Sequence, residues 1–269
     1  MQISIPDASV FARQFEPHGS TDRAYLAHHF GRFASTLVEF CTSWDLQRGN
    51  RVLDIGAHWL HQSILWKQAG FDITAVDLPI TFEMANVQSI ARAMDIKLIP
   101  CANLEAADAF DAIADSSADV ILFTEIIEHL TFNPIRFWKQ VYRILAPNGR
   151  LVVTTPNYYA WNGRAWDFGR FLRGFGGGIS VDAILGTHTY GHHWREFSKH
   201  EVIRYFCLLS PDFNTVKAKT VRNYYPEPND ARKKLASGIY ERFPGLRPNL
   251  HLEIELSSKD HGIVMQPSW

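Results

Sequence analysis

Three side chains that can bind metals or move protons follow one short apolar run of the sequence. Glu125, Glu128 and His129 come directly after the run 118–123. On a helical turn, their spacing would place two carboxylates and an imidazole on one face. Such a face can hold a divalent cation, or it can take a proton from a hydroxyl, because imidazole titrates near neutral pH.

A second group of candidates lies in a histidine-rich segment further along the chain. His188, His192 and His193 fall within six residues. We expect His193 to complete the first group, because it stands where the chain returns toward the sheet. Two glutamates and two histidines would suit Mg²⁺, Mn²⁺ or Zn²⁺ and leave positions open for substrate oxygens. Without a metal, His129 or His193 would act as the base.

Acids and a glycine end two earlier apolar runs. Residues 52–57 read Val-Leu-Asp-Ile-Gly-Ala, and Asp77 ends the next run, 23 residues after Asp54. Gly56 would let a ligand approach the backbone, and the helix that follows would favour a carboxylate at its N-terminus. A carboxylate at position 77 can accept both hydroxyls of a ribose. Its alternative role is to cap a helix before Pro79.

Apolar runs that alternate with amphipathic segments must position these residues. The expected strands are 51–56, 71–76, 97–101, 118–123, 150–155, 215–224 and 251–257. The expected helices are 22–44, 59–69, 82–94, 133–145 and 198–209. This order predicts a doubly wound α/β fold, with a mostly parallel seven-stranded sheet that a C-terminal β-hairpin pair closes. Ligands bind beyond the carboxyl ends of such strands, where Asp54, Gly56 and Asp77 fall.

We predict a single domain over residues 1–269. A helical lead-in at 1–48 precedes a ligand-binding core at 51–155, and a helix with the closing strands fills 198–269. Between them, residues 156–197 are rich in glycine, histidine and aromatic side chains. A long insertion after a strand is typical of a lid or substrate loop.

The composition is that of an ordinary globular protein. Of 269 residues, 46% are hydrophobic, and the net charge of −1 disfavours a chain built to neutralise phosphates. Three widely spaced cysteines favour thiols in a reducing compartment. No run approaches the ~20 apolar residues of a membrane span, and residues 1–15 lack the pattern of a secretion signal. We therefore expect a soluble cytoplasmic protein without a membrane span.

Several motifs, in order along the chain, resemble those of class I S-adenosylmethionine-dependent methyltransferases. They are the run 52–57 with Ser63, the segment DVILFTEIIEHL at 119–130, the helix, turn and strand at 137–155, and HWREFS at 193–198. The residues that this resemblance assigns to S-adenosylmethionine are Asp54, Gly56, Ala57, Asp77, Asn103, Leu104 and Glu125.

Two residues depart from the first motif of this family. His58 and Leu60 stand where glycines are usual. They motivate one alternative, a non-catalytic binding protein with a methyltransferase fold. They also argue against a dinucleotide-dependent dehydrogenase, which would need G-x-G-x-x-G at this point.

The E-x-x-E-H segment resembles that of metal-assisted O-methyltransferases acting on ubiquinone precursors or on RNA 3′ ends. The resemblance implies catalytic roles for Glu125, His129 and His193, and metal ligation by these three together with Glu128. Metal-free members of the family share the segment, so the metal remains open. We predict methyl transfer to a hydroxyl of a small molecule or glycan. RNA 2′-O-methylation is the alternative, although no basic stripe is longer than 232–234.

Overall fold

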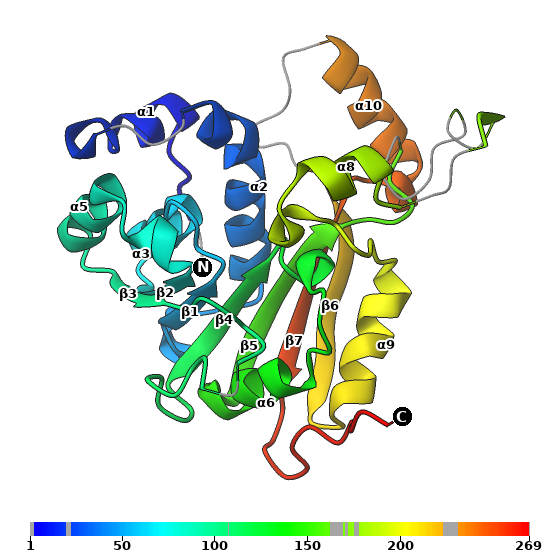
Figure 1. The fold of residues 1–269 in the computed structure, drawn as a ribbon. Coiled ribbons are helices and arrows are strands. Elements are labelled where there is room, and N and C mark those ends of the chain that lie inside the picture. The colour runs from blue at the N-terminus through cyan, green and yellow to red at the C-terminus, as the bar shows by residue number, and fades with distance from the viewer. Residues whose placement is uncertain are drawn as a thin grey trace.

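The fold is a seven-stranded sheet between two layers of helices (Figure 1). The computed structural model describes residues 3–19, 23–106, 108–161, 169, 172–174, 178–222 and 231–268. None of the described helices combines the length and the apolar character that crossing a bilayer requires.

The strands are β1 (Arg51–Ile55), β2 (Asp72–Asp77), β3 (Lys97–Pro100), β4 (Ala118–Thr124), β5 (Leu145–Pro156), β6 (Phe213–Val221) and β7 (Asn249–Leu256). Their order across the sheet is β3-β2-β1-β4-β5-β7-β6. The first five are parallel, whereas β7 runs antiparallel to both of its neighbours. The predicted doubly wound sheet, with its closing antiparallel pair, is confirmed.

The longer helices are α1 (Ala8–Arg13), α2 (Arg23–Cys41), α3 (His61–Gln68), α5 (Ala85–Ala93), α6 (Ile135–Ile144), α8 (Val181–Gly186), α9 (Lys199–Leu209) and α10 (Ala231–Arg242). Apolar side chains of α1, α2, α3 and α5 form one core with residues such as Val52 and Val120. Those of α6 and α9 form a second core with Leu53 and Ile121. Successive side chains of a strand point to opposite faces, so the continuous apolar runs supply both cores.

The predicted helices and strands begin and end within three residues of the observed ones, except at the start of β5. The helix expected at 82–94 begins only at Ala85, as α5, because Phe82 ends the short helix α4 (Pro79–Phe82) and the chain turns at Glu83 and Met84. The strand expected to begin at residue 150 instead begins at Leu145, since Leu145 already pairs with Ala118 of β4. The register then shifts before Arg150 pairs with Val120. Neither change moves the carboxyl ends of the central strands.

Candidate active site

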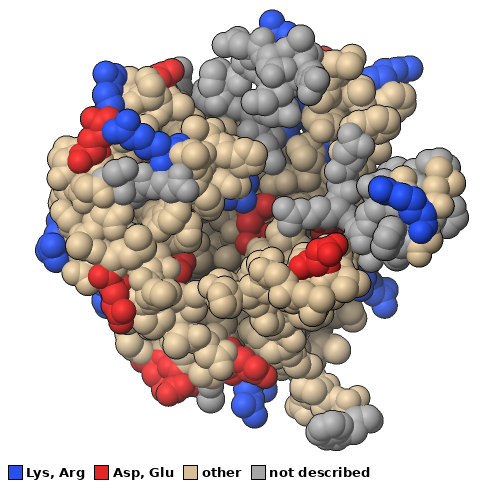
Figure 2. All heavy atoms as spheres, turned by 45° about the horizontal axis from the view of Figure 1, so that its top comes forward, with Lys and Arg blue, Asp and Glu red and all other residues tan. Residues whose placement is uncertain are grey.

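The predicted site residues lie in a row along one edge of the sheet. Neighbouring strands are about 4.8 Å apart, and the strand order places Asn103 after β3, Asp77 at the end of β2, Gly56 after β1 and Glu125 after β4. Figure 2 shows the molecule with this edge turned toward the viewer. Its surface is hollowed near the centre, and acidic and basic side chains lie at the floor of the hollow.

Asp54 supports this edge from within the core. Its side chain is buried, and its Oδ2 accepts a hydrogen bond of 2.6 Å from Ser63 Oγ on α3. Burial raises the pKa of Asp54 to about 7, because a charged carboxylate loses its hydration there. The hydrogen bond from Ser63 opposes this shift. Asp54 therefore joins β1 to α3 behind the ligand edge.

The replacement Asp54→Asn should stabilise the protein at high pH. A carboxyl group whose pKa is raised on folding favours the folded state below about pH 4, and this contribution is lost as the pH rises to about 7. Asparagine has no such dependence. The free energy of unfolding of Asp54→Asn, relative to that of wild type, should therefore rise by about 2–3 kcal/mol between pH 5 and pH 8.

Urea denaturation at the two pH values measures this difference. Asp95→Asn is the control, because the Asp95 side chain is fully exposed and its replacement should give no such pH dependence. A constant difference between wild type and Asp54→Asn would show that Asp54 is already ionised in the folded protein at pH 5.

His58 and Leu60 stand in the loop after β1 where the family usually has glycines, and both take up a backbone conformation that glycine favours. Gly56, His58 and Leu60 have φ of 79°, 48° and 65°, all in the left-handed region. That conformation costs a residue with a side chain roughly 1–2 kcal/mol. Here contacts offset the cost, because Leu60 is fully buried and the His58 ring packs 4.1 Å from Trp59 between ring centroids. The departures change the side chains and leave the turn intact.

Gly56 and Ala57 bring this loop against β2. Both donate their backbone N–H to Val76 O, at 2.9 and 3.1 Å. A Cβ at Gly56 would collide with the side chain of Ile126, which follows β4. Glycine avoids both the strain of a positive φ and this contact, which another residue would relieve only by moving the Ile126 side chain.

Asp77 points its carboxylate into the loop. Oδ2 accepts from the backbone N–H of His58 and Oδ1 from that of Leu78, each at 2.7 Å. The residue at the N-cap of α4 is Leu78, which makes no side-chain capping bond. Each oxygen of Asp77 keeps a lone pair for another donor. The two backbone bonds hold the carboxylate in one orientation.

The pair after β3 is placed less firmly. Asn103 is exposed, and its Oδ1 accepts from the backbone N–H of Glu105 at 2.9 Å. Leu104 is half-buried and packs against the core formed with α6 and α9. A ligand at this end of the row would meet the Asn103 amide and the Leu104 side chain.

Glu125 lies apart from the two candidates that follow it. Its φ is 55°, and the helical turn begins only at Ile127, so the three residues do not share a helical face. Its Oε1 accepts from Thr154 Oγ1 and Asn249 Nδ2, both at 2.9 Å, and its Oε2 lies 3.0 Å from a guanidinium nitrogen of Arg32. These contacts bind Glu125 to β5, β7 and α2.

Glu128, His129 and His193 come together. One potential ligand atom of each lies within 4.8 Å of the others, and the two imidazole rings are 4.6 Å apart between centroids. Among the described residues, this is the group of acids, histidines and cysteines that could hold a metal ion. The structure therefore places three of the four predicted ligands together and leaves Glu125 outside the group.

The end of the insertion, at residues 192–194, is held against this cluster by backbone groups. His129 Nδ1 lies 3.0 Å from His192 O, and Trp194 donates its N–H to Glu128 O at 2.8 Å. With Nδ1 as donor, Nε2 of His129 carries the lone pair that binds a metal or accepts a proton. It lies 4.0 Å from Glu128 Oε1.

Two buried polar atoms of the cluster have no hydrogen-bond partner among the described residues. They are Glu128 Oε1 and His193 Nδ1, the latter 3.8 Å from Glu196 Oε1. Oε2 of Glu128 accepts from Thr155 Oγ1 at 2.9 Å. Burial, and then the charge of Glu125, raise the pKa of Glu128 well above its ordinary value. Buried acceptors are costly when unsatisfied, so a proton or a cation would stabilise this carboxylate.

Asn157 closes the base of the insertion. It forms a parallel bridge with Phe197, and Tyr158 donates its N–H to Phe197 O at 2.9 Å. The side-chain amide of Asn157 donates to Gly245 O and Arg247 O, both at 2.8 Å. The insertion thus leaves and rejoins the sheet at one point beside the cluster.

Part of the insertion lies outside the described residues, namely 162–168, 170–171 and 175–177. The role of 156–197 as a lid stays a prediction. Before this gap, Tyr158, Tyr159 and Trp161 are exposed, and after it the segment from residue 178 returns to the cluster.

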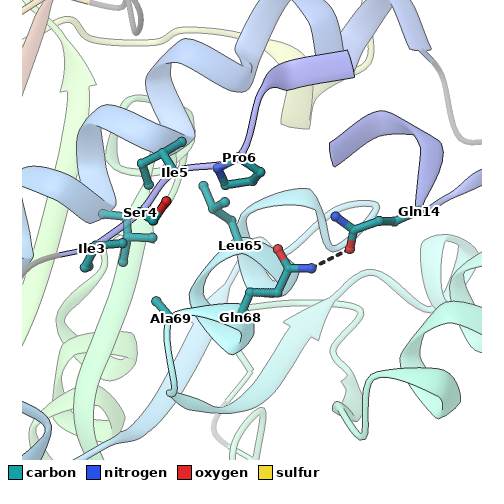
Figure 3. Close-up of a pocket in the computed structure, with 9 residues that line it drawn as sticks. Ile3, Ser4, Ile5, Pro6, Gln14, Leu65, Gln68 and Ala69 are labelled. Carbon is teal, nitrogen blue, oxygen red and sulfur yellow. Dashed lines mark hydrogen bonds between the residues drawn. The ribbon is translucent and has the colours of Figure 1, made fainter. Parts of the chain in front are cut away.

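A separate pocket of about 500 Å³ lies between the N-terminal segment 3–6 and the second half of α3 (Figure 3). Gln14 and Gln68 are hydrogen-bonded to each other at its rim. The pocket is lined by none of the residues expected to bind cofactor, acceptor or metal.

Among the polar residues of the site that are absent from the sequence-based set, three are partners of Glu125. Arg32, Thr154 and Asn249 all hold Glu125. Arg32 could have been noticed, because it lies about two helical turns after Tyr25 on the side of α2 that faces the sheet. The other two come from strands whose pairing must be known first.

Comparison with known proteins covers most of the chain. The family model described as methyltransferase domain matches residues 25–208. No curated protein matches this sequence. The matched range contains the whole row of strand-end residues and all three members of the cluster.

Several solved structures share the fold. A chain from the complex between the Haloferax volcanii Trm112 activator and its methyltransferase has a TM-score of 0.60 at 12% identity, over 93% of this chain and 99% of that one. Burkholderia thailandensis 1,6-didemethyltoxoflavin N1-methyltransferase, solved with S-adenosylhomocysteine, has a TM-score of 0.56 at 14% identity, over 96% and 94%. An S-adenosylmethionine-dependent methyltransferase from Mesorhizobium loti has 0.55 at 15%, over 81% and 96%.

Proposed function

The chain belongs to the methyltransferase domain family, and from this premise we propose that it transfers the methyl group of S-adenosylmethionine to a hydroxyl of a small molecule or glycan. The chain is thus a methyltransferase by family. The cluster of Glu128, His129 and His193 supports the proposed acceptor class and the proposed help of a metal.

The donor would lie along the row of strand ends. Asn103 and Leu104 would contact the adenine, and Asp77 would accept from the ribose hydroxyls. The methionine part would cross Gly56 toward Glu125. This path is supported by the fixed orientation of the Asp77 carboxylate and by the open turn at Gly56. Its methyl group would then point toward the cluster beyond β4.

Methyl transfer needs an acceptor oxygen in line with the sulfonium. The oxygen forms a bond to the methyl carbon while the carbon–sulfur bond breaks, its electron pair stays on sulfur, and the hydroxyl proton must leave. His129 Nε2 is suited to take that proton, because its Nδ1 is committed to the carbonyl of His192. His193, whose ring lies 4.6 Å from that of His129 between centroids, would position the hydroxyl.

The same three residues fit a divalent metal. Two imidazoles and one carboxylate form a common ligand set for such ions, and the unpartnered oxygen of Glu128 is an available ligand atom. A bound cation would lower the pKa of an acceptor hydroxyl that it contacts. Because nitrogen supplies two of the three ligands, Zn²⁺ or Mn²⁺ suits the group better than Mg²⁺.

A transfer assay with labelled S-adenosylmethionine tests this function. Sugar, quinone and RNA acceptors are each incubated with the protein, with and without a strong chelator. We expect label on a hydroxyl acceptor from the sugar or quinone sets, and loss of transfer in chelator that Zn²⁺ or Mn²⁺ restores. Transfer to RNA alone would reject the proposed acceptor class. Transfer that is indifferent to chelator would reject the metal and leave the methyltransferase assignment.

A further inference from the structure

Glu196 places a buried carboxylate beside one histidine of the cluster. Its side chain is only 5% exposed, and its Oε1 lies 3.8 Å from His193 Nδ1. The preceding residue, Arg195, points to solvent, with its side chain 64% exposed. A buried carboxylate is costly without hydrogen-bond donors. Of these two charged neighbours, the acid is therefore the one that the chain turns toward the imidazole.

The backbone on both sides of Glu196 is held by hydrogen bonds. Trp194 donates its N–H to Glu128 O at 2.8 Å, and Phe197 O accepts from the N–H of Tyr158 at 2.9 Å. These two anchors are only three residues apart in the sequence. They keep the Glu196 carboxylate at the cluster even where the rest of the insertion takes another path.

The tautomer of His193 decides which of its nitrogens can bind a metal or a hydroxyl. In a neutral imidazole one nitrogen carries the proton and the other the lone pair. His193 Nδ1 is buried and has no hydrogen-bond partner among the described residues. The Glu196 carboxylate beside it would stabilise a proton on Nδ1 and repel a lone pair there. The lone pair then belongs to Nε2.

His129 shows the same arrangement with a neutral partner. Its Nδ1 lies 3.0 Å from His192 O, which leaves Nε2 as the reactive nitrogen. The partner of His193 is an acid, and hydrogen bonds to ionised acceptors are the stronger kind. The separation of 3.8 Å would have to shorten by about 1 Å to become such a bond. Contacts of this kind tighten when a ligand fixes the ring.

We propose that Glu196 is a positioning residue of the cluster: its carboxylate accepts the Nδ1 proton of His193, so that His193 offers the lone pair of Nε2 to the metal or the acceptor hydroxyl. The inference rests on the proposed function, since it needs a ligand at the cluster. It adds a residue that touches neither donor nor acceptor and acts only through His193.

The tautomer can be measured without any turnover. Protein labelled with ¹⁵N in its histidines is freed of metal by a chelator and studied by NMR above neutral pH, and the His193 signals are identified by their loss in His193→Gln. In wild type we expect the proton on Nδ1. In Glu196→Ala the ring should change to the form protonated on Nε2, which free histidine prefers. Glu196→Gln keeps an acceptor oxygen and should retain the wild-type form.

Calorimetry with Zn²⁺ on the same metal-free proteins gives the consequence for binding. The affinity for Zn²⁺ should fall about 10–100-fold in Glu196→Ala and by a smaller factor in Glu196→Gln. Binding of S-adenosylmethionine should stay within threefold of wild type in both. Arg195→Ala changes the adjacent, solvent-facing residue and should keep the wild-type tautomer and Zn²⁺ affinity. Circular dichroism checks that each variant is folded, and Glu196→Gln serves if Glu196→Ala is not.

The outcomes separate this role from the proposed function. A wild-type His193 with its proton on Nε2 would overturn the positioning role, and so would a Glu196→Ala variant that keeps both the tautomer and the Zn²⁺ affinity. A Zn²⁺ affinity that Glu196→Gln leaves unchanged would also count against it. If wild type binds neither S-adenosylmethionine nor Zn²⁺, the proposed function fails, whereas the tautomer still shows whether Glu196 orients His193.

Discussion

Glu128→Gln is expected to lower kcat/KM for methyl transfer at least a hundredfold and to leave the affinity for S-adenosylmethionine within threefold of wild type. Glutamine has the same shape, and its amide oxygen can keep the hydrogen bond from Thr155. It loses the anionic ligand that the cluster offers. Loss of a metal ligand costs more than the 10–100-fold of a residue that only orients one. Donor binding is spared because Glu128 lies beyond β4.

The measurement combines turnover, calorimetry with the donor and elemental analysis of the purified protein. Glu83→Gln, an exposed glutamate on the other side of the row, is the matched control and should behave as wild type. Excess Zn²⁺ or Mn²⁺ should partly restore Glu128→Gln. Full activity in a strong chelator, with no metal in the protein, would end the metal hypothesis, and an active Glu128→Gln would remove Glu128 from the mechanism.

Asp77→Ala is expected to weaken binding of S-adenosylmethionine and S-adenosylhomocysteine roughly ten- to hundredfold. Two charge-assisted hydrogen bonds from ribose hydroxyls to one carboxylate contribute about 1.5–3 kcal/mol. The carboxylate also holds the N–H groups of His58 and Leu78, so its loss would loosen the turn. Calorimetry gives the affinities, and circular dichroism checks the fold.

An analogue of S-adenosylhomocysteine without ribose hydroxyls separates the two effects. Wild type should bind the analogue about as weakly as Asp77→Ala binds the parent compound, and the variant should lose little further affinity for the analogue. Asp72→Ala changes an exposed carboxylate at the opposite end of β2 and serves as control. Unchanged affinity in Asp77→Ala would remove that residue from the ribose site.

The sheet could be predicted from the sequence because its central strands are buried on both faces and read as uninterrupted apolar runs. Ala118–Thr124 and residues 150–155 are examples. The acids at strand ends followed from the same pattern, since parallel strands end at one edge. The start of β5 was predicted less well. A proline and a glycine at 147 and 149 indicate a turn, yet Leu145, which precedes them, also pairs with β4, and the register shifts before pairing resumes at Arg150.

The acceptor side could be predicted only in part, for a local reason. The spacing of Glu125 and Glu128 fits a helical face, but one residue with positive φ at Glu125 breaks that geometry. Sequence spacing does not report a single left-handed residue. The partners of Glu125 come from α2, β5 and β7, and Arg32 lies more than 90 residues away in the sequence. The partners on β5 and β7 became visible only with the topology, because the pairing of those strands must be known first.

The bridge between Asn157 and Phe197 has a consequence for how such an enzyme changes substrate. The two ends of the insertion are clamped side by side, and His192 to Trp194 are fixed by backbone bonds to the η3 turn (Ile127–His129). Closing a loop on such anchors costs only about 0.6 kcal/mol more for each doubling of its length. Evolution, or a designer, could therefore exchange residues 158–191 for segments of other length and composition. The reacting groups would stay in register while the acceptor changed.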